Sequence, residues 1–218
     1  MTQIVKIFDE YNIPEDLRIK VTEILSNKKL IIICDDSSSM NDIENGDSRW
    51  NHLKNIIKII AEMQFSLGNR CDIRFLNKLT DPCFTSDQVD KIFAPKPSGI
   101  TPLVTIMKSI MNELKNEKNE IILLLALDGN PTDNGIIDPV KEFHKIIKKM
   151  PKNITLSVMV MTSDKNSVSY LFDSHININI LNEYFLMKSD NESYNIGLHA
   201  MKFMTPDIKK NDKKCIII

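Results

Sequence analysis

Two short polar segments of the sequence place oxygen ligands directly after long apolar runs. One segment contributes Asp35, Ser37 and Ser39, and the other contributes Asp128, directly after the run 121–127. Side chains two residues apart point to the same side of an extended segment, so the first carboxylate and the two hydroxyls converge. Hard oxygen ligands of this kind suit Mg²⁺ or Mn²⁺ and not Zn²⁺, and neither segment holds a soft ligand.

The apolar pattern of the chain predicts a fold that brings these two segments together. Strand-like runs alternate with helical runs, which predicts an α/β, Rossmann-like doubly wound fold with a mostly parallel central sheet and helices on both faces. In such folds, ligands bind beyond the carboxyl ends of the central strands. The expected strands are 30–34, 71–76, 121–127, 155–161 and 176–181, and the expected helices are 14–25, 50–67, 87–93, 102–118, 136–150, 167–173 and 193–204.

Length and composition predict one sizeable domain in a reducing compartment. We expect an N-terminal helical extension at 1–28 that packs on the domain, the domain itself at 29–205, and a basic tail at 206–218. The formal net charge of −1 and the lack of a basic patch outside the last residues argue against nucleic acid as a partner. The four cysteines show no paired spacing, and the N-terminus lacks the apolar run of a secretory signal. These features predict a cytoplasmic protein.

The two polar segments, with a third between them, resemble the metal-ion-dependent adhesion site of von Willebrand factor A (vWA) domains. Residues 35–40, Asp-Asp-Ser-Ser-Ser-Met, resemble the Asp-x-Ser-x-Ser motif of that family. Residues 98–103, Ser-Gly-Ile-Thr-Pro-Leu, resemble its Gly-x-Thr-Pro loop. Residues 127–129, Leu-Asp-Gly, resemble its Thr-Asp-Gly segment, with Leu in place of Thr. The order and wide separation of the motifs also match, over most of the chain from about 30 to 181.

The resemblance implies the vWA fold, and two further segments suggest a branch of the family. Residues 49–50, Arg-Trp, and residues 75–77, Phe-Leu-Asn, resemble an intracellular, eukaryotic-type branch. Leu127 departs from the family's threonine, but that position is not one of the metal ligands. The implied ligand set is therefore complete.

The resemblance also implies a role for each of five residues. Ser37 and Ser39 would bind a Mg²⁺ or Mn²⁺ ion through their hydroxyls, and Thr101 would bind it directly or through water. Asp35 and Asp128 would act mainly through water. The remaining coordination position would accept an Asp or Glu carboxylate from a partner protein. The implied function is a cation-dependent protein-binding module of the adaptor or adhesion type.

Two other functions are compatible with parts of the sequence. An Asp after a central strand also suits a Mg²⁺-dependent phosphoryl-transfer or phosphatase-like enzyme. Haloacid-dehalogenase-like phosphatases, however, carry a second Asp where this chain has Ser37, and no Gly-rich phosphate loop or Ser–His–acid set is evident. A structural domain without metal, in which 35–39 is a solvated loop or a helix cap, is the third possibility.

The remaining polar and sulfur-containing residues are expected to have structural roles. We expect Asp36 to be an exposed acid near the site, and Asp133 and Asp138 to be loop or cap residues. Cys34 is expected to be buried and inert. The histidines lack metal-ligand spacing, and the methionines on strands and helices are expected to fill the core; these residues are His52, His144, His175, His199, Met159, Met161, Met201 and Met204.

The end of the printed sequence matches a lipidation motif. Residues 215–218, Cys-Ile-Ile-Ile, fit the C-a-a-X prenylation pattern, and four lysines lie just upstream. One lipid with a basic cluster is a two-signal arrangement that holds a protein at a cytoplasmic membrane face. Ile at the last position is not a usual choice, and its similarity to Leu would favour geranylgeranyl. A last strand or a disordered end are the alternatives.

If Ile218 is the natural end of the chain, protein made in eukaryotic cells should carry a prenyl group on Cys215. The modification should place part of the protein in the membrane fraction, and Cys215→Ser should return that part to the soluble fraction. Intact mass spectrometry with cell fractionation measures both effects. If Cys215 is unmodified, and Cys215→Ser does not change how the protein divides between the membrane and soluble fractions, the prediction of membrane attachment is wrong.

Overall fold

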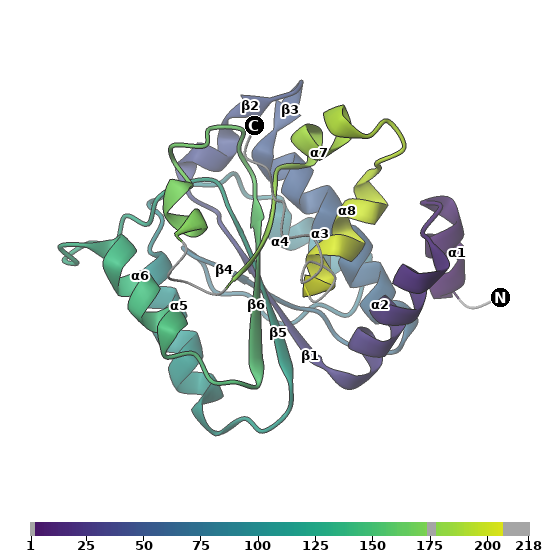
Figure 1. The fold of residues 1–218 in the computed structure, drawn as a ribbon, viewed down its shortest axis with the longest axis horizontal. Helices are drawn as coiled ribbons and strands as arrows, with labels where there is room; N and C mark the ends of the chain where they lie inside the picture. The colour runs from purple at the N-terminus through teal and green to yellow at the C-terminus, as the bar shows by residue number, and fades with distance from the viewer. Residues whose placement is uncertain (1–2, 174–177, 207–218) are drawn as a thin grey trace.

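A five-stranded parallel sheet forms the centre of the computed structural model, which describes residues 3–173 and 178–206 (Figure 1). The strand order is β4-β1-β5-β6-β7. The bounds are Lys29–Cys34 for β1, Asp72–Phe75 for β4, Ile121–Leu127 for β5, Ile154–Val160 for β6 and Asn179–Leu181 for β7. After β1 the chain moves to one side for β4 and returns to the other side for β5. The topological switch point therefore lies between β1 and β5.

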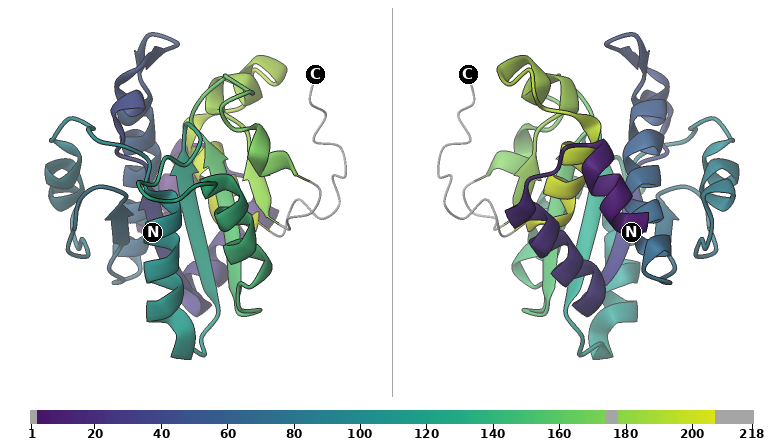
Figure 2. Two further views of the ribbon diagram at one scale, coloured as in Figure 1. Left: turned by 90° about the vertical axis from the view of Figure 1, so that its left-hand side faces the viewer. Right: turned by 90° about the vertical axis from the view of Figure 1, so that its right-hand side faces the viewer.

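Helices cover both faces of this sheet, as Figure 2 shows from the two sides. One face carries α1 (Gln3–Glu10), α2 (Glu15–Asn27), α3 (Arg49–Ser66) and α8 (Ile196–Met204), with α4 (Ser86–Phe93) beside α3. The other face carries α5 (Leu103–Glu113), the 3₁₀ turns η2 (Leu114–Asn116) and η3 (Ser169–Phe172), and α6 (Pro139–Lys148). The expected doubly wound α/β fold is confirmed.

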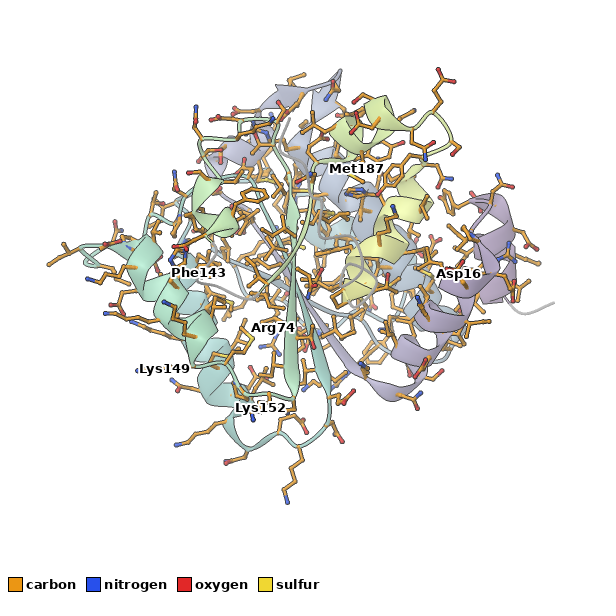
Figure 3. The ribbon with its side chains drawn as sticks, in the orientation of Figure 1. Asp16, Arg74, Phe143, Lys149, Lys152 and Met187 are labelled. Carbon is orange, nitrogen blue, oxygen red and sulfur yellow. The ribbon has the colours of Figure 1, made fainter. Side chains whose placement is uncertain are left out.

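The continuous apolar strands are explained by burial on both faces. Along β5, Ile122, Leu124 and Ala126 enter the core beneath α3 and α8, while the alternate residues enter the core beneath α5 and α6. Side chains fill the space between helices and sheet on both faces, and Phe143 of α6 is fully buried (Figure 3). Since both faces need apolar residues, the central strands show no alternation of polar and apolar positions.

Most of the expected elements are present with small shifts at their ends. The strand at 121–127 has the predicted bounds, and 71–76, 155–161 and 50–67 differ from β4, β6 and α3 by one residue at each end. The expected helix at 136–150 begins later, because Asp138 caps α6 and accepts a hydrogen bond from the Lys141 amide. The expected helix at 167–173 is only the 3₁₀ turn η3.

Three elements of the described residues, besides a 3₁₀ turn at Ser38–Asn41, were not predicted. The first is α1, which precedes the expected helix at 14–25 and shares its core. The second is a hairpin of β2 (Ile43–Glu44) and β3 (Asp47–Ser48), and the third is α7 (Tyr184–Asp190). The hairpin strands are too short to show alternation, but the turn Asn45-Gly46 has positive φ at both residues and is a recognisable hairpin signal.

The described residues contain no helix that is long and apolar enough to cross a membrane. Cys215, its upstream lysines and all of the expected tail except Pro206 lie outside these residues. His175 and the first part of the expected strand 176–181 also lie outside them. The prenylation expectation therefore stays a prediction.

Candidate metal centre

The switch point between β1 and β5 places Asp35 and Asp128 at the same edge of the sheet. Cys34 is paired with Ala126 in the parallel register, and the Asp35 amide donates to the Ala126 carbonyl over 2.9 Å. Asp35 therefore continues the ladder past the end of β1, and Asp128 comes directly after β5. Both side chains are buried, with 0% and 2% of their residue surface exposed.

A chain of hydrogen bonds connects four of the five predicted ligands. The Ser37 amide donates to Asp35 Oδ1 over 2.8 Å, and the hydroxyls of Ser37 and Ser39 lie 3.2 Å apart. The Ser39 hydroxyl donates to Asp128 Oδ1 over 2.9 Å. A 3₁₀ turn, η1 (Ser38–Asn41), brings Ser39 back toward β5. Two distant segments thus place two carboxylates and two hydroxyls in contact.

The fifth predicted ligand, Thr101, is connected to the site through its backbone. Its amide donates to the Thr132 hydroxyl over 2.8 Å, and the Thr132 amide donates to the Thr101 carbonyl over 2.9 Å. The preceding loop is bonded to the first segment, because the Ser98 amide donates to the Asp36 carbonyl and the Ser38 amide donates to the Gly99 carbonyl. Thr101 is 6% exposed. It therefore lies between the two acidic segments.

Asp36 was predicted to be an exposed acid, and this prediction is wrong. Asp36 is only 4% exposed, and its Oδ1 accepts hydrogen bonds from the backbone amide and the side-chain amide of Asn77. The Asn77 side chain also donates to the Ile100 carbonyl over 2.9 Å. Gly99 has a φ of +100°, and a Cβ there would lie 2.7 Å from Asn77 Oδ1. Asp36 therefore fastens the loop at 98–101 to the end of β4.

The carboxylates of Asp35 and Asp128 lie in an environment that disfavours their ionised form. Burial and the neighbouring Asp128 carboxylate raise the pKa of Asp35 to about 7. Asp35 Oδ2 is buried and has no hydrogen-bond partner. Burial also raises the pKa of Asp128, although hydrogen bonds from Ser39 and the Arg49 guanidinium oppose that rise. The neighbouring donors therefore compensate the charge of the two carboxylates only in part. Without a further cation, the site holds either an uncompensated negative charge or a protonated acid.

Arg49 belongs to the site, and sequence reasoning did not give it a role there. Its Nη1 donates to Asp128 Oδ2 over 3.0 Å and to Asp42 Oδ2 over 3.2 Å. Its Nε donates to Glu44 Oε2 over 2.9 Å, and its Nη2 donates to Thr162 Oγ1 over 2.9 Å. Arginine is unfavourable at the first position of a helix such as α3, where the dipole is positive. An arginine at this position was therefore the one sequence feature that could have indicated a role for Arg49 in the site.

The donor set fits a hard divalent cation. The described residues contain no cluster of three or more His, Cys, Asp or Glu side chains that could hold a metal ion, so this candidate centre depends on hydroxyls together with two carboxylates. Mg²⁺ and Mn²⁺ prefer such oxygen donors and retain water ligands. The unpartnered Asp35 Oδ2 supplies a buried acceptor that a cation or its water would satisfy.

The other residues singled out from the sequence have structural roles in the described part of the chain. Asp133 Oδ1 and Oδ2 accept from the Thr105 and Val104 amides at the start of α5, so the prediction of a cap residue is confirmed. His199 is buried beside the Tyr194 hydroxyl, and His144 contacts the Tyr170 carbonyl. Cys34 is buried, and so are Met159, Met161, Met201 and Met204.

Comparison with known proteins gives a likeness of fold. No family model and no curated protein sequence matches the chain. Among solved structures, it is similar to proximal thread matrix protein 1 (PTMP1) from the mussel byssus, with 16% identity and a TM-score of 0.50. The match covers 81% of this chain and 46% of the mussel chain. A second structure of the same mussel protein gives a TM-score of 0.49. The chain thus spans about half the length of the protein that it resembles in fold.

The raised pKa of Asp35 predicts a pH dependence of stability in metal-free buffer. The folded chain binds this proton more tightly than the unfolded chain, whose value is near 3.8, so ionisation lowers stability as pH rises from about 4 through about 7. Asp35→Asn removes this proton equilibrium. In chelator at pH 8, the variant should therefore melt several degrees above the wild type. For a chain of this length, about 2–4 °C in melting temperature corresponds to 1 kcal/mol of stability.

Near pH 3 the difference in melting temperature should nearly vanish, because that pH lies below the pKa of Asp35 in both the folded and the unfolded wild type. Melting curves from pH 3 to pH 8 measure the difference. Two melting profiles that stay parallel over this range would contradict the assignment.

Proposed function

We propose that the chain binds one Mg²⁺ or Mn²⁺ ion at Asp35, Ser37, Ser39, Thr101 and Asp128, and that the ion receives a carboxylate from a partner protein. The observation that carries the proposal is the buried, unpartnered Asp35 Oδ2 beside a second buried carboxylate. Two acids in this position cost free energy unless they are protonated or a cation compensates them. A divalent cation would compensate both charges at once.

The resemblance to the vWA adhesion site supplies the roles of the ligands. The hydroxyls of Ser37 and Ser39 would hold the ion together with Thr101, and the two aspartates would hold its water ligands. When bound, the ion would supply a Lewis acid for one oxygen of the partner. The residues that would hold it lie at the carboxyl edge of the sheet.

The loops around the site offer a surface for the partner. Loops at 41–48, 94–99 and 130–135 emerge near the carboxyl ends of the strands, and we expect them to set specificity. Large apolar side chains are exposed on the hairpin, beside Thr101 and before α6, namely Ile43, Ile100 and Ile137. Exposed apolar residues around a polar centre are typical of protein-binding sites.

A cavity of about 550 Å³ adjoins the site and would hold a neighbouring side chain of the partner. Thr162 lines it and accepts a hydrogen bond from Arg49, which is bonded to Asp128. Its apolar wall includes Val160, Val168, Phe172 and Leu186. A peptide with an acid close to a bulky apolar residue would fill both places, since the volume is in the range of small ligand pockets.

We place this function in the cytoplasm. The three cysteines of the described residues, Cys34, Cys71 and Cys83, are free and buried, and buried thiols of this kind persist under reducing conditions. Attachment to a membrane through Cys215 is a separate proposal, and neither metal binding nor partner binding depends on it.

Metal binding should stabilise the folded chain, because only the fold assembles ligands from three distant segments. At a concentration 100 times its Kd, Mg²⁺ or Mn²⁺ should add about 2.7 kcal/mol to the free energy of unfolding. Ca²⁺ should add less, since it prefers more ligands at longer distances. Thermal melting with and without chelator, combined with calorimetric titration, measures the effect.

Asp35→Ala and Asp128→Ala should abolish that increment. Asp138→Ala is a matched control, because this residue caps α6 and is not one of the proposed ligands, so the change should lower stability without removing the response to metal. Melting and titration curves of the wild type that millimolar Mg²⁺ and Mn²⁺ leave unchanged would sink the proposal of a metal centre.

The partner should bind only when the cation is present. In a pulldown from lysate, proteins captured by the wild type in Mg²⁺ should be absent in chelator and absent with Ser39→Ala, whose fold circular dichroism should confirm. A partner that binds equally well in chelator would use another surface. Metal-dependent turnover of a phosphate ester, lost in Asp35→Ala, would favour the phosphoryl-transfer enzyme instead.

A further inference from the structure

The Arg49 side chain occupies the position of a counter-ion for the candidate metal centre. Its guanidinium bonds to Asp128 Oδ2 over 3.0 Å, while the other oxygen of that carboxylate accepts from Ser39. Its side chain is only 15% exposed, and the Asp128 side chain is 0% exposed. An ion pair with this much burial is screened far less than a surface pair. Arg49 thus neutralises one of the two buried acids.

The other bonds of Arg49 hold its positive charge at the site. Glu44 on β2 lies 2.9 Å from Nε, and Asp42 lies 3.2 Å from Nη1. Thr162 accepts from Nη2, and the Ser163 amide donates to the same Glu44 carboxylate. The hairpin and the loop after β6 therefore fix the guanidinium between them. Its planar fork makes this set of bonds possible, and a lysine could not reproduce it.

A fixed positive charge next to Asp128 reduces the attraction of the site for a divalent cation. Coulomb repulsion between a guanidinium and a doubly charged ion over a few ångströms remains substantial at a partly buried site. The Arg49–Asp128 bond also draws on the same carboxylate that a metal-bound water would need. A metal-bound water would therefore compete with Arg49 for the charge of Asp128.

We propose that Arg49 is a built-in competitor of the divalent cation, which lowers the metal affinity of the site by compensating Asp128 within the chain. The proposal rests on the proposed metal-binding function and extends it. It implies that metal binding loosens Arg49 from Asp128 and leaves it to Asp42, Glu44 and Thr162. The hairpin β2–β3 and the loop at 162–164, which contact Arg49, are then the parts of the surface whose contacts change when the metal binds.

The test compares cation affinity in Arg49→Gln and in the wild type. Glutamine removes the charge, so Mg²⁺ and Mn²⁺ should bind on the order of tenfold more tightly, as measured by calorimetric titration of the metal alone. In chelator, Arg49→Gln should melt below the wild type, because three acids lose their counter-ion. In Mg²⁺ this difference in melting temperature should shrink.

Two further variants separate charge from general damage. Arg49→Lys retains the charge, so its cation affinity should stay within about twofold of the wild type even though the fork is lost. Arg74→Gln is a matched control, because Arg74 (Figure 3) also pairs with two acids, Asp72 and Glu113, but lies on the edge strand β4. Its metal affinity should equal that of the wild type.

The outcomes distinguish this inference from the proposed function. If the wild type binds metal and Arg49→Gln binds it equally or more weakly, the competitor role is wrong and the metal centre stands. If only Arg49→Gln binds metal, the competitor role stands, and the function proposed for the wild type is wrong. If neither variant binds metal, both proposals are overturned. If Arg49→Gln does not fold in chelator, folding on addition of Mg²⁺ supports the competitor role, and failure to fold with Mg²⁺ contradicts it.

Discussion

Two aspartates end neighbouring strands of a parallel sheet, and the burial of their carboxylates is the constraint on which the rest of the site depends. Asp35 and Asp128 are brought together by the register of β1 and β5. Moving either carboxylate out of water costs several kcal/mol unless donors or cations replace the lost solvation. The surrounding chain supplies Ser37, Ser39 and Arg49 for this purpose. One oxygen, Asp35 Oδ2, is left without a donor.

The loops at this edge of the sheet are fastened to one another independently of any ion. The Ser98 amide donates to the Asp36 carbonyl, and the Ser38 amide donates to the Gly99 carbonyl. Asn77 joins Asp36 to the Ile100 carbonyl. These bonds hold the loop that contains Thr101 close to the acidic segments, although Thr101 is part of neither segment. The three segments of the proposed ligand set are therefore preorganised by neutral and charge-assisted backbone contacts.

The fold and the convergence of four of the proposed ligands could be predicted because their signals are local. The run 121–127 is apolar on both faces, which predicts a central strand. A carboxylate directly after a central strand lies at the carboxyl edge of the sheet. Alternation along 35–39 places Asp35, Ser37 and Ser39 on one side, and the structure joins them. The same alternation turns Asp36 to the opposite side. Its burial could not be predicted, because the partner that covers it is Asn77, 41 residues away.

The contacts of Arg49 could not be predicted for the same physical reason. Its partners come from the hairpin and the residue before it, from the residue after β5, and from Thr162, which is 113 residues away in the sequence. Local propensity describes such a residue only as a cation at the wrong end of a helix dipole. The helix tolerates this cost because five acceptors surround the guanidinium, including the Ser39 carbonyl.

A preorganised site of this kind has a consequence for how cation affinity is set. Since the loops are already bonded to one another, little of the binding energy of a proposed cation would be spent on ordering the chain. Affinity then depends mainly on the charge that the protein leaves uncompensated. That charge is the difference between two buried acids and the one guanidinium that pairs with Asp128. Position 49 therefore controls the electrostatics of the site, while the serines and Thr101 control its shape.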